Sequence, residues 1–270
     1  MYWSPELVTT FVKMLPPMLR EAGLADVGVT NGENTNWYRF GTWGYAYALY
    51  DDEEALRNLA LITSHGFYAG GYGRWFGEHK SEGIDILREK RPELKAWVTS
   101  TSWSKMDAKN IKEMHGNIYT TKVNGIIPWA GIQRPPQWYE GDPNPGSAFR
   151  VSEDGQYEVR RGYYFYKQIA RAGQPGMAVA RTSANDSEIA LIAFDNNGTP
   201  NADAFVMVNL DDEERTVLID IVGNESPRYR AWRTTEDEKD LYKSIGDFQV
   251  ENNQIRYAAP AGSVTTFFGE

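Results

Sequence analysis

The sequence lacks cysteine, long apolar runs and any basic tract. With no cysteine among 270 residues, disulfides and thiolate chemistry are excluded. No apolar run approaches the roughly 20 residues that a membrane-spanning helix needs. The formal charge is −9. This charge argues against nucleic acids and anionic membranes as partners, because either would repel the chain.

The first residues, MYWSPELVTT, lack the charged and apolar regions of a signal peptide, which favours the cytoplasm without deciding the compartment. Hydrophobic residues make up 41% of the chain and charged residues 24%, values ordinary for a soluble globular protein. A chain of 270 residues can form one large domain or two smaller ones.

The composition changes along the chain, and this change predicts two domains. Eight of the nine tryptophans lie before residue 140. From about residue 176 onward, about seven short alternating strands are separated by turn residues, a pattern typical of an antiparallel β-sandwich. We assign residues 1–150 to an α/β domain, and residues 151–270 to a linker helix (162–173) and the sandwich.

The first domain alternates helices and strands. Ser4 and Pro5 can begin a helix, which Pro16 and Pro17 should kink or split. Its apolar stripe is predicted to be Leu7, Phe11, Met14, Leu15 and Met18. Four strands each follow a helix, a pattern that predicts a parallel sheet; they cover 27–30, 59–67, 94–98 and 124–133. No glycine fingerprint follows any of them, so nucleotide binding has no support.

Polar and aromatic residues follow strand after strand in this domain. Ligands of parallel α/β folds bind at the carboxyl ends of the strands, so this pattern predicts a site. Tryptophan and tyrosine rings suit sugars, whose apolar faces pack on a ring while their hydroxyls reach polar neighbours. The candidate binding residues are Asn36, Trp37, His65, Tyr68, Ser100, Trp103, Trp129 and Gln133.

Several segments, in this order, resemble family 30 of the glycoside hydrolases, whose members join a (β/α)8 barrel to a β-sandwich side domain. They are YWSPELVTTFVKMLPPMLREAGL (2–24), SHGFYAG (64–70), WVTSTSW (97–103), IIPWAGIQ (126–133) and YYFYKQIARAGQPGMAVA (163–180). The resemblance implies the second half of a barrel followed by its side domain. It also implies hydrolysis of a β-linked oligo- or polysaccharide.

The resemblance places the family's acid/base glutamate on a strand that this sequence does not contain, and aligns its nucleophile glutamate with Ser100. A serine hydrolase built from Ser100 and His65 has no nucleophile elbow to support it. Glu33 directly follows the first strand and is our candidate catalytic carboxylate, although it also fits an ordinary solvated loop residue. Glu140 lies in a Pro- and Gly-rich loop and is interpreted as structural.

Three classes of function remain open: a glycoside hydrolase, a carbohydrate-binding protein without catalysis, and a structural or assembly protein on the same scaffold. We propose no metal or other cofactor, because the acidic runs are too contiguous to form a geometric metal site. Half a barrel would leave strand edges and an apolar interior open to water. We therefore expect a homodimer through the half-barrel; the alternative is a truncated chain.

Overall fold

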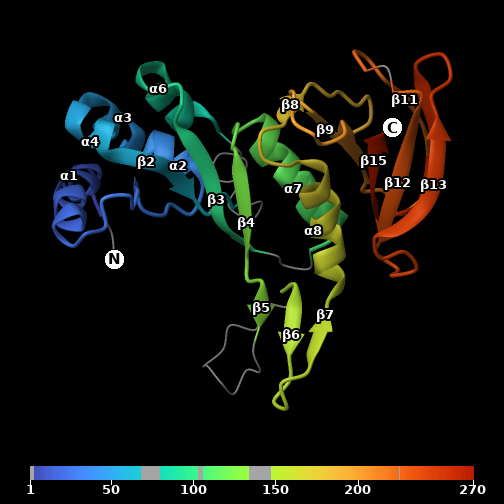
Figure 1. The fold of residues 1–270 in the computed structure, drawn as a ribbon, viewed down its shortest axis with the longest axis horizontal. Helices are drawn as coiled ribbons and strands as arrows, with labels where there is room; N and C mark the ends of the chain where they lie inside the picture. Colours follow the sequence, from blue (N-terminus) through green and yellow to red (C-terminus); the bar gives the residue numbers. More distant parts are fainter. Residues whose placement is uncertain (1–2, 68–79, 103–105, 134–146, 225) are drawn as a thin grey trace. The chain divides into compact units, whose positions relative to one another are not determined.

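A computed structural model describes residues 3–67, 80–102, 106–133, 147–224 and 226–270, with only the backbone of residues 101, 102 and 133. The chain forms two compact units (Figure 1). The first contains residues 1–102 and 116–129, and the second contains residues 103–115 and 130–270.

The first unit is a mixed α/β structure. Its described elements, in chain order, are α1 (Pro5–Glu21), β1 (Val29–Thr30), α2 (Trp37–Thr42), α3 (Tyr45–Asp51), α4 (Glu53–Asn58), β2 (Leu59–Ser64), α6 (Glu82–Lys90), β3 (Lys95–Ser102) and β4 (Gly125–Trp129). The helix α7 (Ala108–Tyr119) contributes its residues from Gly116 onward to this unit. The sequence did not predict α2 and α3.

The four strands form one parallel sheet in the order β1-β2-β3-β4. In its register Val29 pairs with Leu59, Ile62 with Ala96, and Val98 with Ile126. The prediction of four parallel strands is confirmed. Because the strands are parallel, their carboxyl ends lie along the same edge of the sheet, where the polar residues were expected.

Helices α1, α3, α4 and α6 pack on one face of this sheet (Figure 1). The core between them contains Leu49, Leu56 and Leu87 from the helices, together with Ile62 and Val98 from the strands. All five are at most 4% exposed. Each such side chain stabilises the fold by about 1.5–3 kcal/mol through burial.

Helix α1 begins as predicted, but its buried side differs in part from the predicted stripe. The Ser4 hydroxyl accepts a hydrogen bond of 3.3 Å from the amide of Leu7, and the helix continues unsplit through Pro16 and Pro17. Its core contacts are made by the buried Val8 and Val12 and by the partly buried Leu15 and Leu19, of which Leu15 belongs to the predicted stripe. The predicted stripe was wrong in part, because α1 is apolar on more than one side; Leu7, Met14 and Met18 are 55%, 53% and 55% exposed.

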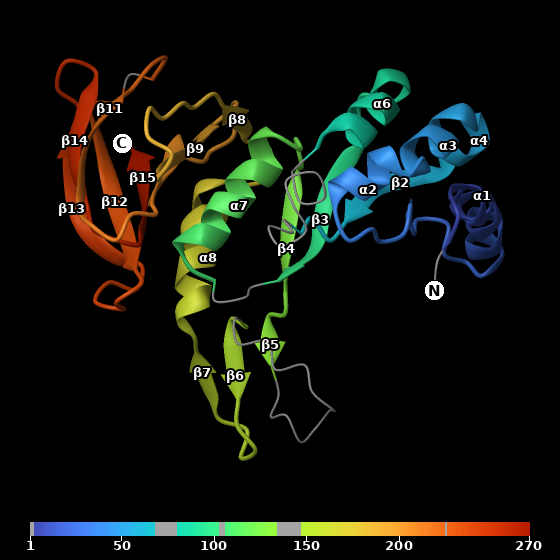
Figure 2. The same ribbon diagram turned by 180° about the vertical axis from the view of Figure 1, so that it is seen from behind.

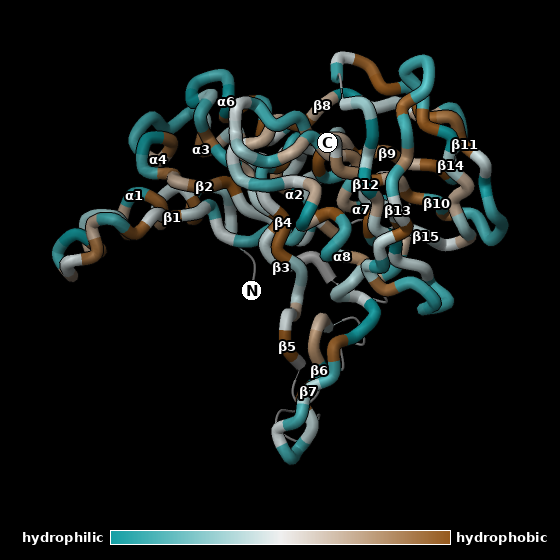
Figure 3. Tube along the Cα trace, turned by 45° about the vertical axis from the view of Figure 1, so that its right-hand side comes forward, coloured by the Kyte–Doolittle hydropathy of each residue, from teal (hydrophilic) through white to brown (hydrophobic). Residues whose placement is uncertain are grey.

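The opposite face of the sheet carries exposed apolar side chains. Along β3, Ala96 and Val98 point into the core, so the alternating Trp97 points away from it. Trp97, Ile127 and Trp129 are 39%, 47% and 52% exposed. Figure 3 shows hydrophobic stretches along β3 and β4.

The second unit combines α8 and the first part of α7 with two antiparallel sheets and a mixed sheet of the order β5-β6-β7, in which β5 and β6 are parallel (Figure 2). Its elements are β5 (Ile132–Gln133), β6 (Phe149–Val151), β7 (Tyr157–Val159), α8 (Arg161–Ala172), β8 (Ala178–Ala180), β9 (Ile189–Asp195), β10 (Ala204–Asn209), β11 (Arg215–Asp220), β12 (Arg228–Thr235), β13 (Lys243–Gln249), β14 (Gln254–Ala259) and β15 (Ser263–Gly269). The six-stranded sheet has the order β13-β12-β15-β10-β9-β8, and β11 pairs with β14.

The two sheets share one core, in which Ile219 and Tyr257 of the smaller sheet lie with Phe205 and Phe267 of the larger one. The sequence of QVENNQIRYAA (249–259) resembles that of a single strand, but the segment belongs to two strands, β13 and β14. They separate at Asn252 and Asn253, whose φ angles of 52° and 61° place them in the left-handed region that asparagine tolerates.

The predicted linker helix is α8, and it is anchored to the larger sheet by Gln168. This buried side chain donates a hydrogen bond of 2.8 Å to Thr234 Oγ1 and accepts one of 2.6 Å from Thr266 Oγ1. Since buried amides are costly to leave unpaired, these bonds define how α8 sits on the sheet. Within the described part of the chain, no helix has the length and apolar character needed to cross a membrane.

Candidate active site

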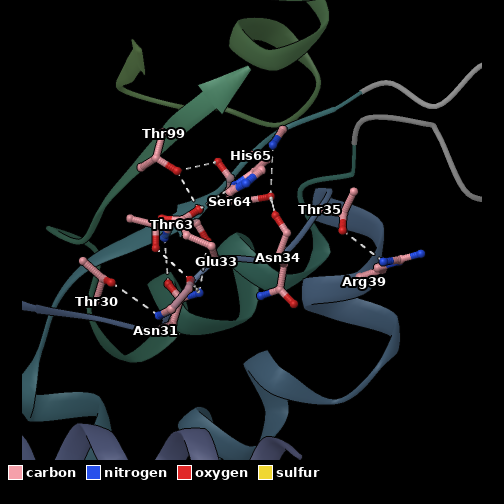
Figure 4. Close-up of polar contacts among 12 residues, drawn as sticks. Thr30, Asn31, Glu33, Asn34, Thr35, Arg39, Thr63, Ser64, His65 and Thr99 are labelled. Carbon is pink, nitrogen blue, oxygen red and sulfur yellow. Dashed lines mark hydrogen bonds and ion pairs between the residues drawn. The ribbon is translucent and has the colours of Figure 1, made fainter. Parts of the chain in front are cut away.

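The candidate site lies in the first unit, at the carboxyl ends of β1, β2 and β3. Its centre is the loop of residues 31–36, which connects β1 to α2 (Figure 4). The strand β1 is only two residues long. Hydrogen bonds beyond the strand must therefore hold the loop in place.

Asn31 extends the pairing of β1 with β2 through its side chain. Its Oδ1 accepts a hydrogen bond of 2.7 Å from the amide of Thr63, and its Nδ2 donates one of 3.0 Å to the Thr63 carbonyl. The next residue, Gly32, has φ +77°, a conformation that glycine adopts without strain. The chain thus turns immediately after Asn31 and brings Glu33 to the end of the sheet.

The far side of the loop is bonded to the segment after β2. The Asn34 carbonyl accepts hydrogen bonds from the His65 amide at 2.8 Å and from Ser64 Oγ at 3.0 Å. The Thr35 carbonyl accepts one of 3.1 Å from the Phe67 amide. Glu33 and His65 therefore lie on two segments that are bonded to each other through their backbones.

Glu33 joins these segments to β3 through one carboxylate oxygen. Its Oε2 accepts a hydrogen bond of 2.6 Å from Thr99 Oγ1 and lies 3.1 Å from His65 Nδ1 (Figure 4). An ionised carboxylate can only accept, so this contact is a hydrogen bond in the tautomer of His65 that carries its proton on Nδ1. We call Glu33, His65 and Thr99 the strand-end triad.

The triad is partly open to solvent, since the Glu33 and His65 side chains are 38% and 33% exposed. Both donors use Oε2, and the described residues offer Oε1 no hydrogen bond. A carboxylate oriented by two donors, with a second oxygen left for a ligand, has the geometry expected of a general acid/base or of an acceptor for a sugar hydroxyl.

Two of the predicted binding residues are structural. Trp37 is 1% exposed, and its Nε1 donates a hydrogen bond of 3.1 Å to Asn117 Oδ1. Its ring belongs to the core and is closed to a ligand, because α2 turns it inward. Asn36 is 4% exposed and caps α2 by accepting a hydrogen bond of 3.0 Å from the Arg39 amide.

The other predicted site residues fall into three groups: those in the sheet of the first unit, one in the second unit, and those outside the described residues. Trp129 ends β4 and is 52% exposed, and Ser100 is half-buried in β3, next to the threonine that contacts Glu33. Gln133 lies in β5, within the second unit, and only its backbone is described. Tyr68, Trp103 and Glu140 lie outside the described residues.

Sequence reasoning missed Thr99, the residue of β3 that contacts Glu33. The alternation along this strand, in which Leu94, Ala96 and Val98 are apolar and buried, extends only to Val98. Between Val98 and Thr101 the pairing of β3 with β4 is irregular, so the sequence pattern does not fix the direction of the Thr99 side chain. Asn31 was missed as well, since its role depends on which strand lies beside it.

In the first unit, the described loop residues directly after the strands are 31–36, which follow β1, and 65–67, which follow β2. Among them only Glu33 carries a carboxyl group. Classical glycoside hydrolysis uses two carboxyl groups, about 5–5.5 Å apart with retention and about 6.5–9.5 Å apart with inversion. The described residues also contain no cluster of three or more histidine, aspartate or glutamate side chains that could hold a metal ion.

The sequence matches no protein-family model and no curated protein. Solved structures do share its fold. A family 30 endoxylanase from Clostridium papyrosolvens has 18% identity and a TM-score of 0.73 over 100% of this chain and 61% of its own. A family 30 subfamily 8 xylanase from Clostridium acetobutylicum has 16% identity and a TM-score of 0.74 over 98% of this chain and 60% of its own.

An endo-β1,6-glucanase is also similar, with 19% identity and a TM-score of 0.64 over 100% of this chain and 55% of its own. The chain thus spans about 60% of the length of the two xylanases and 55% of the glucanase. At these identities the likeness concerns the fold alone. Over this part of their length the protein shares the fold of these glycoside hydrolases, and the resemblance to family 30 that its motifs suggest is confirmed at that level.

Proposed function

We propose that this protein is a glycoside hydrolase-like protein that acts on a β-linked oligo- or polysaccharide at the carboxyl ends of β1 to β4. The observation that carries the proposal is the strand-end triad, in which Glu33 is oriented by Thr99 and His65 at 2.6 Å and 3.1 Å. It lies on a fold shared with xylanases and a glucanase. Glu33 is the catalytic carboxylate in this proposal.

The second carboxylate is proposed to come from another copy of the chain. Two surfaces of the first unit support such an assembly. The face of the sheet turned away from the helices exposes Trp97, Ile127 and Trp129, and α1 exposes a second apolar strip. Exposed apolar surfaces of this kind mark interaction sites in soluble proteins.

A two-fold axis would join two four-stranded sheets into one closed barrel or pack their open faces together. The division into a half-barrel domain (residues 1–150) and a linker helix with a β-sandwich (residues 151–270) belongs to the same proposal. The Glu33 carboxylates of the two copies would then be the pair that glycoside hydrolysis requires. The ligand contacts of Ser100 and Trp129 are part of this proposal.

Hydrolysis assays on a panel of β-linked glycans test the catalytic role of Glu33. Glu33→Gln keeps the size of the side chain but removes its charge and its ability to transfer a proton. We expect turnover to fall at least about 10²-fold, the lower range of general acid–base contributions. The matched control is Glu89→Gln on the exposed side of α6. Equal turnover in the Glu33 variant and the wild type would contradict the proposal.

A second candidate function is carbohydrate binding without catalysis. It is favoured by Ser100, which stands where the resemblance places a nucleophile glutamate, and by the single carboxylate at the described strand ends. Calorimetric titration with the same glycans separates the two. Binding without product formation would establish the second function, and product formation abolished by Glu33→Gln would establish the first.

Light scattering coupled to size exclusion tests the assembly. We expect a mass of twice the 30.6 kDa of one chain, and Ile127→Glu should shift the protein toward the monomer because it places a charge in the apolar contact. The control is Val222→Glu, at a site that is 90% exposed in the second unit. A wild-type monomer at micromolar concentration would overturn the dimer.

A further inference from the structure

The second unit contains a concave surface that the strand-end triad does not use. It has a volume of about 590 Å³ and is formed by α8 together with strands of the larger sheet. Pockets for small molecules and sugars generally measure about 300–1,000 Å³. We call it the aromatic groove; its lining residues are Tyr163, Tyr166, Lys167, Ala170, Arg171, Trp232, Tyr242 and Phe268.

One side of α8 supplies half of the groove. Tyr163, Lys167 and Arg171 are spaced four residues apart, so they lie on one face of the helix. Phe165 and Gln168 are 0% exposed and anchor the opposite face to the sheet. The helix is therefore held rigidly from behind while its aromatic and cationic face lines the groove.

Three rings supply the other half, Trp232 from β12, Phe268 from β15 and Tyr242 from the residue directly before β13. Trp232 and Tyr242 lie nearly parallel, with ring centroids 6.1 Å apart and an interplanar angle of 19°. Phe268 meets Trp232 edge-on, with centroids 5.3 Å apart. The rings support one another, and Trp232, Tyr242 and Phe268 are each half-buried. They thus form a pre-organised aromatic surface that can bind an apolar ligand face without reordering.

Tyr242 is held in a conformation that its side chain disfavours. Its φ angle is 53°, a left-handed value that is a genuine outlier for a bulky residue. Its amide donates a hydrogen bond of 3.1 Å to Thr234 Oγ1, which helps to keep the backbone there. Strain of this kind costs about 1–3 kcal/mol and clusters at functional sites. Glycine or asparagine would tolerate this backbone conformation better than tyrosine does. The strain therefore points to a role for the tyrosine side chain in the groove.

The charges in the groove are all of one sign. Lys167 Nζ lies 4.3 Å from the centroid of the Tyr242 ring, and Arg171 lies one helical turn further along. Among the residues that the structure describes, no acidic side chain lines the groove, although the chain carries a net charge of −9. Burial raises the pKa of Tyr166 and of Tyr242, so both phenols stay protonated near neutral pH and can donate hydrogen bonds.

We propose that the aromatic groove is a second carbohydrate-binding site, specific for a pyranose that carries a carboxylate, as uronic acids do. The apolar face of the sugar packs against the half-buried aromatic surface of Trp232, Tyr242 and Phe268, the phenols bind its hydroxyls, and Lys167 and Arg171 bind the carboxylate. The site is complete within the second unit. It therefore holds the glycan whether or not Glu33 is catalytic.

Affinity electrophoresis with two forms of one polymer tests this site. Glucuronoxylan in the gel should retard the wild-type protein, and the same polymer with its carboxylates reduced to alcohols should retard it much less. Lys167→Ala and Arg171→Ala should each weaken binding to glucuronoxylan about tenfold or more, the effect expected of a lost hydrogen bond to a charged group. Arg256→Ala removes the same charge from the exposed side of β14 and should bind like the wild type.

The aromatic surface is tested by Tyr242→Asn. Asparagine tolerates a φ of 53°, so the fold should remain and thermal unfolding verifies this. Loss of the ring should abolish retardation by glucuronoxylan.

Two results would overturn the proposal. One is equal retardation of wild type, Lys167→Ala and Arg171→Ala. The other is equal retardation of the wild type by the native and the carboxyl-reduced polymer. Absence of any retardation would also overturn it and would leave a protein partner as the occupant to examine.

Discussion

Thr99 Oγ1 donates a hydrogen bond of 2.6 Å to Glu33 Oε2, although the two residues are 66 positions apart in the sequence. Glu33 follows β1 and Thr99 lies in β3, and β2 separates these strands in the sheet. The contact therefore bridges over the end of the middle strand, where His65 reaches the same oxygen from the side. Three strands thus converge on one carboxylate.

The first prediction concerns this bridge. Thr99→Val keeps the shape of the side chain but removes the donor, whereas Thr99→Ser keeps the hydroxyl. We expect the valine variant to bind the glycan substrate about tenfold more weakly, because a hydrogen bond to a charged group contributes about 1.5–3 kcal/mol in protected sites and less where solvent competes. The serine variant should stay close to the wild type. Calorimetric titration measures both, and equal affinities of the two variants would refute a positioning role for Thr99.

Gly66 is predicted to tolerate no side chain. Its φ is +67°, and a Cβ atom there would lie 2.6 Å from Val98 Cγ2. Gly66→Ala should lower the free energy of unfolding by about 2–4 kcal/mol, from left-handed strain and overpacking together. It should also displace His65.

Gly32→Ala is the matched control for Gly66→Ala. Its φ is +77°, but a Cβ atom would meet nothing within 4 Å, so only the strain applies. Urea unfolding of both variants isolates the cost of the clash. Equal losses of unfolding free energy in Gly66→Ala and Gly32→Ala would show that Val98 moves away from the new Cβ atom without cost.

Two tryptophans should respond in opposite ways to replacement by phenylalanine. Trp37→Phe loses the buried hydrogen bond to Asn117 and should cost about 1–3 kcal/mol of stability while glycan affinity is retained. Trp129→Phe, at an exposed position, should change stability little. If the Trp129 ring stacks on the sugar, Trp129→Phe should weaken binding of the glycan. Thermal unfolding and titration of both proteins check this pair.

Glu113 in α7 should make stability depend on pH. Burial raises its pKa to about 7, from 4.5; Lys109 counteracts this and Asp107 adds to it. Between these pH values the folded protein holds a proton on Glu113 that the unfolded chain releases. The protonated Glu113 therefore contributes its full stability in acid, and this stability is lost as pH rises toward neutrality.

Glu113→Gln removes this dependence. The free energy of unfolding of the variant should equal that of the wild type at about pH 4. At about pH 8 it should be higher than that of the wild type by about 2 kcal/mol. Glu158→Gln on the exposed surface of β7 serves as the control and should change neither value. Urea unfolding at the two pH values measures the effect, and a constant difference between Glu113→Gln and wild type would contradict it.

The strands and most helices of this protein could be predicted from the sequence, because they depend on local patterns. The apolar runs of β2 and β3, the cap at Ser4 and the helix at α8 act over a few residues. The order of motifs also indicated a glycoside hydrolase fold, which the solved structures share. A parallel sheet with its polar residues at one edge follows from these elements alone.

The sequence by itself thus determined the elements, the parallel sheet and Glu33 as the acid at its edge. The tertiary structure alone decided which neighbours each side chain meets. It turned α1 onto Val8 and Val12, buried Trp37 against Asn117, and chose Thr99 instead of Ser100 as the partner of Glu33. Periodicity states which residues share a face, whereas contacts between distant segments depend on how the faces pack against one another.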